Sequence, residues 1–193
     1  MNAIDICSRA MRQARVLAAG EIPTEEDLDD AIETLKSILL RAVSEGAFGR
    51  LNNAIATEGD FIAEPMTRVV RNNADNTSIT LPETITNEDG ETDLPYDRSV
   101  IAIADQLTNQ TVTYIYDLDV ARWLPIETMT ATSVVPLSAR DAKGLSAYLS
   151  VEISDEYGQE VREATARAAL RFNASLLNGQ SRPRQRHNPP EWC

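Results

Sequence analysis

The stretch TEEDLDDAIETLKSILLRAVSEG, residues 24–46, decides how the N-terminal part of the chain folds. Five of its apolar residues recur at intervals of four, three, four and four, which places them on one helix face: Leu28, Ile32, Leu35, Leu39 and Val43. Thr24 precedes the acidic first turn as an N-cap, with Asp27 three residues on, close to a capping box. The glycine that closes the stretch is a stop signal. The pattern predicts an amphipathic helix from Glu25 to about Glu45, whose apolar stripe needs cover from other helices.

A helix is also predicted before this one, from about Ala3 to Ala19, with its stop at Gly20. Its apolar stripe consists of Ile4, Cys7, Met11, Ala14 and Ala18. Three arginines lie largely off that stripe: Arg9, Arg12 and Arg15. Because the loop between the two helices is short, they are expected to form an antiparallel hairpin.

Two more helices are predicted after Pro136. Residues 138–141 can cap a helix that runs through about Tyr157 and ends at Gly158. The last helix is predicted from Gln159 to Leu177. Its helical stripe is Val161, Ala164, Ala168, Phe172 and Leu176.

The middle of the chain, between these helical pairs, has short runs of β-branched and aromatic residues separated by Pro, Asn, Asp and Thr. Strands are predicted at 67–71, 78–81, 99–105, 111–117 and 122–126. The runs at 99–105 and 111–117 are close enough to form a hairpin. Trp123 is interpreted as a strand anchor that packs into a core.

The predicted fold class is therefore α+β. An antiparallel helical bundle of two N-terminal and two C-terminal helices, residues 1–54 and 136–178, carries a strand-rich insert at 55–135. Residues 179–193 form an extended C-terminal tail, because they hold three prolines and no apolar periodicity.

Composition narrows the functional classes. The formal net charge of −12 repels phosphate and disfavours a protein that wraps nucleic acid. No run approaches the roughly 20 apolar residues of a membrane helix, so no membrane contact is expected. The N-terminus does not read as a secretory signal, and Cys7 and Cys193 suit a reducing compartment.

Signatures of enzyme chemistry are weak. The only histidine, His187, lies in the tail, and one histidine with two distant cysteines cannot build a zinc site. Cys7 is interpreted as a buried thiol rather than a nucleophile. We therefore expect no catalytic residues, no metal and no cofactor. An enzyme with a carboxylate pair in the insert stays open as an alternative, because the chain has 30 acidic residues.

The tail carries the candidate contact residues. Arg182, Arg184 and Arg186 alternate, so in an extended chain they point to the same side and can meet carboxylates on a neighbouring subunit or partner. Trp192 has no local core and is a natural interface anchor. We expect this segment to act as a strap onto another protein.

Four stretches carry a family resemblance. They are EIPTEE with DAIETLKSILL and SEG (21–46), SITLP with LPYDRSVI (78–101), YDLDVARWL with PLS and GLSAYL (116–149), and EATARAAL (163–170) followed by the basic tail. Together they span nearly the whole chain, and they resemble the head-to-tail adaptor proteins of tailed bacteriophages, also called head completion, connector or tail tubular proteins.

The resemblance implies a structural adaptor made in the host cytoplasm and located in the virion neck. It implies a homo-oligomeric ring, typically of twelve subunits, docked under the portal protein and presenting a surface to tail or nozzle proteins. DNA would be a non-specific passenger in its channel, and an acidic lumen would not hold it. The alternative is a bacterial α+β protein-binding or regulatory module.

Overall fold

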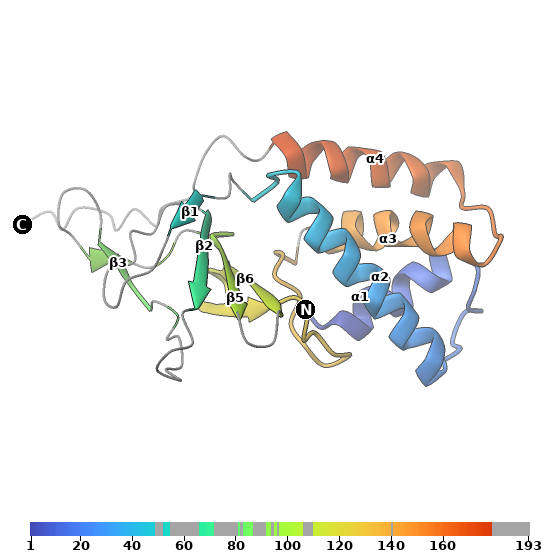
Figure 1. Cartoon of the computed structure of the whole chain (residues 1–193). Coiled ribbons are helices and arrows are strands. Elements are labelled where there is room, and N and C mark those ends of the chain that lie inside the picture. The colour runs from blue at the N-terminus through green and yellow to red at the C-terminus, as the bar shows by residue number, and fades with distance from the viewer. Residues whose placement is uncertain are drawn as a thin grey trace, which may run out of the picture.

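A computed structural model of the chain describes residues 1–48, 52–54, 66–71, 81, 83–86, 92–93, 95, 97–105, 110–139 and 141–178. Its four helices are α1 (Ala3–Gln13), α2 (Glu25–Ser44), α3 (Ala142–Glu156) and α4 (Glu163–Asn178). They gather at one end of the molecule, and the sheet lies at the other (Figure 1). The fold is α+β, as the sequence predicts.

The main sheet has five strands in the order β1-β2-β5-β6-β7. Their bounds are β1 (Asn52–Ala54), β2 (Met66–Arg71), β5 (Val100–Asp105), β6 (Thr111–Asp117) and β7 (Arg122–Pro125). The pairs β1–β2 and β2–β5 are parallel, whereas β5–β6 and β6–β7 are antiparallel. The predicted hairpin is confirmed, with Val100 opposite Ile115. A separate pair, β3 (Ile85–Thr86) and β4 (Thr92–Asp93), is antiparallel.

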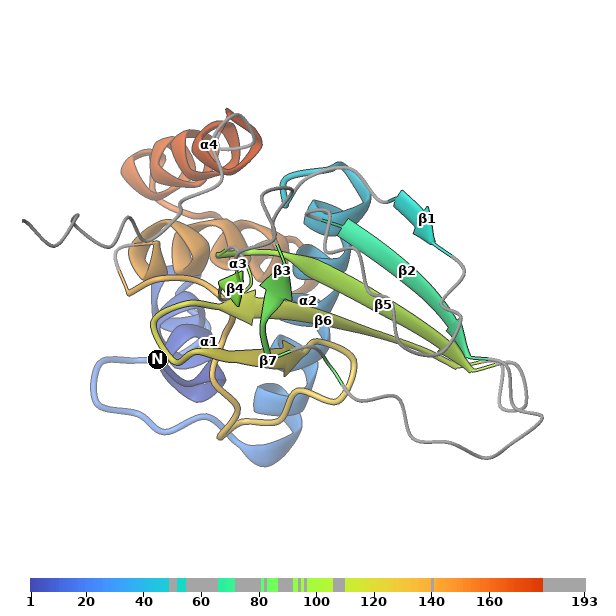
Figure 2. The same ribbon diagram turned by 90° about the vertical axis from the view of Figure 1, so that its left-hand side faces the viewer.

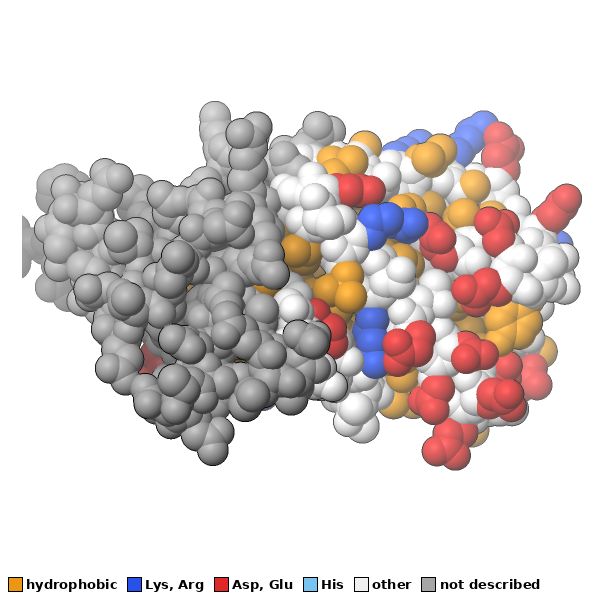
Figure 3. Space-filling view, viewed as in Figure 1, with side chains coloured by type: hydrophobic (Ala, Val, Ile, Leu, Met, Phe, Trp, Pro, Cys, Tyr) orange, Lys and Arg blue, Asp and Glu red, His pale blue; other side chains and the backbone are white. Residues whose placement is uncertain are grey.

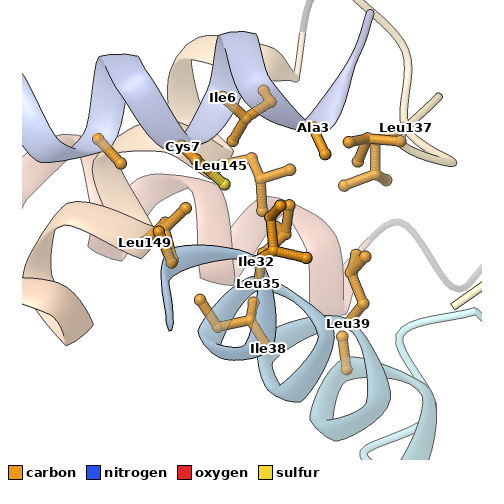
Figure 4. Close-up of a cluster of buried hydrophobic side chains, with 14 of the residues drawn as sticks. Ala3, Ile6, Cys7, Ile32, Leu35, Ile38, Leu39, Leu137, Leu145 and Leu149 are labelled. Atoms are coloured by element: carbon orange, nitrogen blue, oxygen red, sulfur yellow. The ribbon is translucent and has the colours of Figure 1, made fainter. Parts of the chain in front are cut away.

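The apolar stripe of α2 is core, as predicted. Leu35 is completely buried, and Ile32 and Leu39 are nearly so. Figure 4 shows these three side chains pointing toward Leu145 of α3 and Ile6 of α1. Leu28 and Val43, at the two ends of the stripe, are partly buried at the edge of the same cluster.

Helix α3 is the centre of the bundle, because it contacts α1, α2 and α4 (Figure 1). It approaches α4 closely at Gly144, where a Cβ atom would lie 2.5 Å from Cδ2 of Phe172. On its α2 side, the Arg41 guanidinium donates to the Tyr148 hydroxyl at 2.9 Å and to Glu152 Oε1 at 2.6 Å.

One hydrophobic core joins the helices to the sheet. Val100 of β5 and Ile115 of β6 belong to the same buried cluster as Leu35 and Leu145. Figure 2 shows the sheet in front of the helices from this side. The division into a bundle at 1–54 and 136–178 and an insert at 55–135 remains a prediction about organisation, but the two parts share apolar contacts.

A half-buried ion pair reinforces this junction. Arg98, just before β5, donates to Asp141 Oδ2 at 2.6 Å, and Ser138 Oγ donates to the same oxygen at 2.7 Å. Asp141 stands at the N-cap position of α3, within the predicted capping segment, but its carboxylate makes no cap hydrogen bond. The carboxylate instead binds Arg98, which lies just before the central strand β5.

Helix α1 ends earlier than predicted, at Gln13 rather than near Ala19. The reason is a Schellman turn without glycine: Arg15 adopts a φ of 64°, and the Val16 amide donates to the Met11 carbonyl at 2.9 Å. Gly46 and Gly158 close α2 and α3 with the same geometry, at φ values of 77° and 61°. Gly20 lies in the loop beyond α1, and it does not cap that helix.

Helix α4 begins four residues later than predicted, at Glu163 rather than Gln159. The Arg162 carbonyl accepts from the Thr165 and Ala166 amides, so Arg162 is the N-cap residue, directly before the first helical residue. Phe172 and Leu176 of the predicted stripe are buried, and Ala164 is exposed. The predicted strand at 78–81, apart from Leu81, and the tail at 179–193 lie outside the described residues.

Candidate functional site

The residues that the sequence singles out divide into two groups. Arg182, Arg184, Arg186 and Trp192 lie outside the described residues. Trp123 lies on β7, half-buried, with its ring edge-on to Tyr116 at a centroid distance of 5.2 Å. It is therefore a packed strand residue, as predicted.

Cys7 is completely buried in α1, as predicted. Burial raises the pKa of its thiol to about 12, so the thiolate required of a nucleophile does not form at neutral pH. In the described part of the chain, no three His, Cys, Asp or Glu side chains gather as ligands for a metal ion. No helix of that part is both long and apolar enough to cross a membrane.

A hollow on the outer side of α1 has a volume of about 880 Å³. One wall is the exposed face of α1, a second is the loop at Ile22 and Pro23, and a third is the start of α4 at Arg162 and Thr165. Helix α4 reaches this position because α3 packs between it and α1. Segments far apart in the sequence therefore meet around one opening.

Four arginines line this hollow: Arg9, Arg12, Arg15 and Arg162. We call it the arginine groove. The first two follow from helical spacing on the solvent face of α1, and Arg15 joins them through the Schellman turn. Among the described residues, Asp5 is the only acidic one that lines the groove. The surface is thus basic on a chain whose net charge is −12.

The arginines of the groove have few internal partners. Arg12 donates to the Glu21 backbone carbonyl at 3.0 Å and so holds the loop against α1. Among the described residues, none of the four groove arginines forms an ion pair. Gln13 also lines the groove, and its side-chain oxygen is buried without a hydrogen-bond partner among those residues. The guanidinium groups can therefore bind an anion, whereas the buried Gln13 oxygen is an acceptor and adds nothing to that capacity.

Apolar side chains accompany these charges. Ile22 is 83% exposed and Ile4 is 37% exposed, and both line the groove. Large exposed aliphatic side chains beside arginines are typical of protein contact surfaces, since Arg and apolar anchors carry much of the binding energy there.

A second surface has the opposite charge. Tyr157, at the end of α3, donates its hydroxyl to Asp27 Oδ1 of α2 at 3.0 Å. Asp30 and Glu156 lie close enough to act on the same hydroxyl electrostatically. We call Asp27, Asp30, Glu156 and Tyr157 the acidic face. Figure 3 shows acidic side chains gathered over this end of the molecule.

The electrostatics of the acidic face fix its protonation state. Desolvation and the contact with Asp27 raise the pKa of Tyr157 to about 12, so its hydroxyl remains a donor. Hydrogen bonds from Thr24 and Tyr157 lower the pKa of Asp27. At neutral pH the Tyr157 hydroxyl is therefore protonated and the Asp27 carboxylate ionised, as the hydrogen bond between them requires.

The two surfaces lie on different sides of the helical end. Figure 3, viewed as Figure 1, shows the acidic side chains on the near side, over α2. Helix α1 lies behind α2 in that view, and the loop that follows α1 runs to the start of α2 (Figure 2). The exposed face of α1 that lines the groove and the acidic face are therefore two different surfaces of the helical end.

Sequence patterns contained part of this arrangement. The position of Arg9, Arg12 and Arg15 off the apolar stripe was visible, but no local pattern connects them to Arg162, more than a hundred residues away. The acidic first turn of α2 was visible in the sequence as well. Its contact with Tyr157 depends on the packing of α3.

A scan against protein-family models finds no match for this chain, and a search of curated proteins finds no relative.

Proposed function

We propose that the protein is the structural adaptor ring that joins the portal of a phage capsid to the tail. The observation that carries this proposal is the two-ended subunit: helices form one end, a sheet forms the other, and one core joins them. A ring of such subunits would present chemically different surfaces to two different partners. The resemblance of nearly the whole chain to phage adaptors supplies the identity of those partners.

In this proposal the helical bundle forms the body of the ring, and the sheet end projects toward the tail side or the exterior. The shared core supports such a role, because load applied at either end passes through packed side chains. The acidic composition suits a channel through which DNA passes without adhering.

The test is co-assembly with the portal protein encoded in the same genome. Purified portal rings mixed with the chain should show, by cryo-electron microscopy, an additional ring of density on one face. Bare portal rings at a saturating concentration of the chain would contradict the adaptor function. They would favour the alternative of a bacterial protein-binding or regulatory module.

The tail gives a sharper variant of this experiment. A chain that ends at Asn178 should keep its helical circular dichroism and lose portal binding, because the strap of Arg182, Arg184, Arg186 and Trp192 is gone. Trp192→Ala should weaken binding more than Arg184→Ala, since an exposed ion pair contributes only about 0–1 kcal/mol. Unchanged affinity of the truncated chain would place docking on the helical body.

A further inference from the structure

The arginine groove holds guanidinium groups that make no ion pair with the described residues. Arg9, Arg15 and Arg162 are exposed, and none forms an ion pair among the described residues. Arg guanidinium groups bind carboxylates in bidentate geometry, so four of them in one opening favour a ligand with several carboxylates.

The apolar residues of the groove indicate a protein surface rather than a small anion. Burial of Ile22, which is 83% exposed, requires an apolar group on the partner. The acidic face offers such a group, because Tyr157 is 37% exposed and sits among three carboxylates. Carboxylates would meet guanidinium groups, and the tyrosine ring would meet the isoleucine.

The same chain carries both surfaces, and they share no residue. A contact between two different patches of identical subunits is heterologous, and it closes into a ring when the rotation between neighbours divides a full turn. Two copies of one patch would repel each other here, so each groove is expected to meet an acidic face rather than another groove.

We propose that the arginine groove of each subunit receives the acidic face of a neighbouring copy, and that this contact repeats around the ring. The proposal rests on the adaptor-ring function and specifies its lateral interface. The contact is heterologous, salt-sensitive and centred on Ile22 of one subunit and Tyr157 of the next.

Charge reversal tests the pairing. The groove variant is Arg9→Glu with Arg162→Glu, and the face variant is Asp30→Arg with Glu156→Arg. A matched control for the groove variant, Arg122→Glu with Arg171→Glu, makes the same change in net charge as that variant at exposed positions outside both surfaces. Circular dichroism establishes that each variant is folded, and sedimentation velocity over a concentration series measures self-association.

Wild type and control should associate alike, and each reversed variant should associate about a hundredfold more weakly. An equimolar mixture of the two reversed variants should associate again, because intact surfaces meet intact ones and reversed surfaces meet reversed ones. Recovery in the mixture would be specific to this pairing.

A monomeric wild type throughout the series, a groove variant that associates like wild type, or a mixture without recovery would overturn the proposal. So would a groove variant that loses binding to a short duplex DNA while its self-association is unchanged, because the groove would then serve phosphate. Failure of wild type to dock on portal rings would count against the adaptor function and leave the lateral contact standing.

Discussion

Arg15 shows how one residue limits a helix and shapes a surface. It adopts a left-handed φ of 64° directly after α1, at a position that usually holds glycine. An L-residue with a side chain is disfavoured in this conformation. The same turn brings the side chain to the arginine groove. Local backbone strain is therefore retained at a position where the guanidinium has a role in the proposed contact.

We expect Arg15→Gly to be more stable than Arg15→Ala by about 1 kcal/mol, because only glycine relieves the left-handed strain. Both variants lack the guanidinium, so the comparison isolates the backbone. Urea denaturation followed at 222 nm measures the free energy of unfolding. Equal midpoints for the two variants would show that the turn is not strained.

Cys7 gives the protein a pH dependence in the alkaline range. Its pKa is raised to about 12 in the folded state by burial, whereas an unfolded thiol titrates near its ordinary value of about 8.5. As pH rises, the unfolded chain therefore loses this proton before the folded chain does. The free energy of unfolding falls as pH rises above about 8.5. The slope is at most about 1.4 kcal/mol per pH unit.

The measurement is the melting temperature between pH 7 and pH 9.5, below the range where Tyr157 titrates. Wild type should lose stability faster over this interval than Cys7→Ala, which has no thiol at this position. Parallel curves for the two proteins would indicate that Cys7 is reachable by solvent.

At the scale of elements, the contact between α3 and α4 depends on the absence of a side chain at Gly144. A Cβ there would lie 2.5 Å from Cδ2 and 2.7 Å from Cβ and Cγ of Phe172. Because Phe172 Cβ is tied to the backbone of α4, rotation of the ring alone cannot relieve the clash. The spacing of the two helices is set at this point.

Gly144→Ala should therefore destabilise the protein by about 1–3 kcal/mol, although alanine is the better helix former. The double variant Gly144→Ala with Phe172→Ala should lose less than the sum of the two single changes, because Phe172→Ala removes the Cγ and Cδ2 atoms that the new Cβ would meet. Thermal unfolding of wild type, the two single variants and the double variant completes the double-mutant cycle. Strict additivity would mean that the two positions do not touch.

Prediction of the elements from sequence succeeded where one local signal was sufficient. Helix α2 was placed correctly because Thr24 caps it through the Asp27 amide at 3.1 Å and Gly46 ends it. The end of α1 was wrong because its Schellman turn uses arginine, which no local rule marks as a stop. The start of α4 was wrong because Val161 fits the apolar stripe of the helix although residues 159–162 form the connection from α3.

At the scale of the whole molecule, the helices and the sheet should unfold together. Trp123 reports on the sheet and the 222 nm signal reports mainly on the helices, so the two urea transitions should coincide in a Trp192→Phe background. Ile115→Ala, at a completely buried position in β6, should lower the free energy of unfolding by about 2–5 kcal/mol. Both urea midpoints should therefore fall together. A fluorescence midpoint that falls while the helical midpoint stays would reveal two independent units.

The order of the elements and the α+β class could be predicted from sequence, because apolar periodicity is local. The parallel pairing of β1, β2 and β5 and the meeting of α1 with the start of α4 could not, since both depend on contacts between distant segments. For the same reason the proposed lateral interface became visible only in three dimensions.

The central place of α3 has a consequence for synthesis on the ribosome. Helices α1 and α2 leave the exit tunnel first, but the helix that covers both of them follows roughly a hundred residues later. At typical elongation rates of about 5–20 residues per second, Leu35 and Leu39 remain uncovered by α3 for roughly 5–20 seconds. A nascent hairpin with an uncovered apolar stripe is a substrate for chaperones during that interval, so chaperone supply is expected to limit the yield of this protein more than the stability of its finished fold.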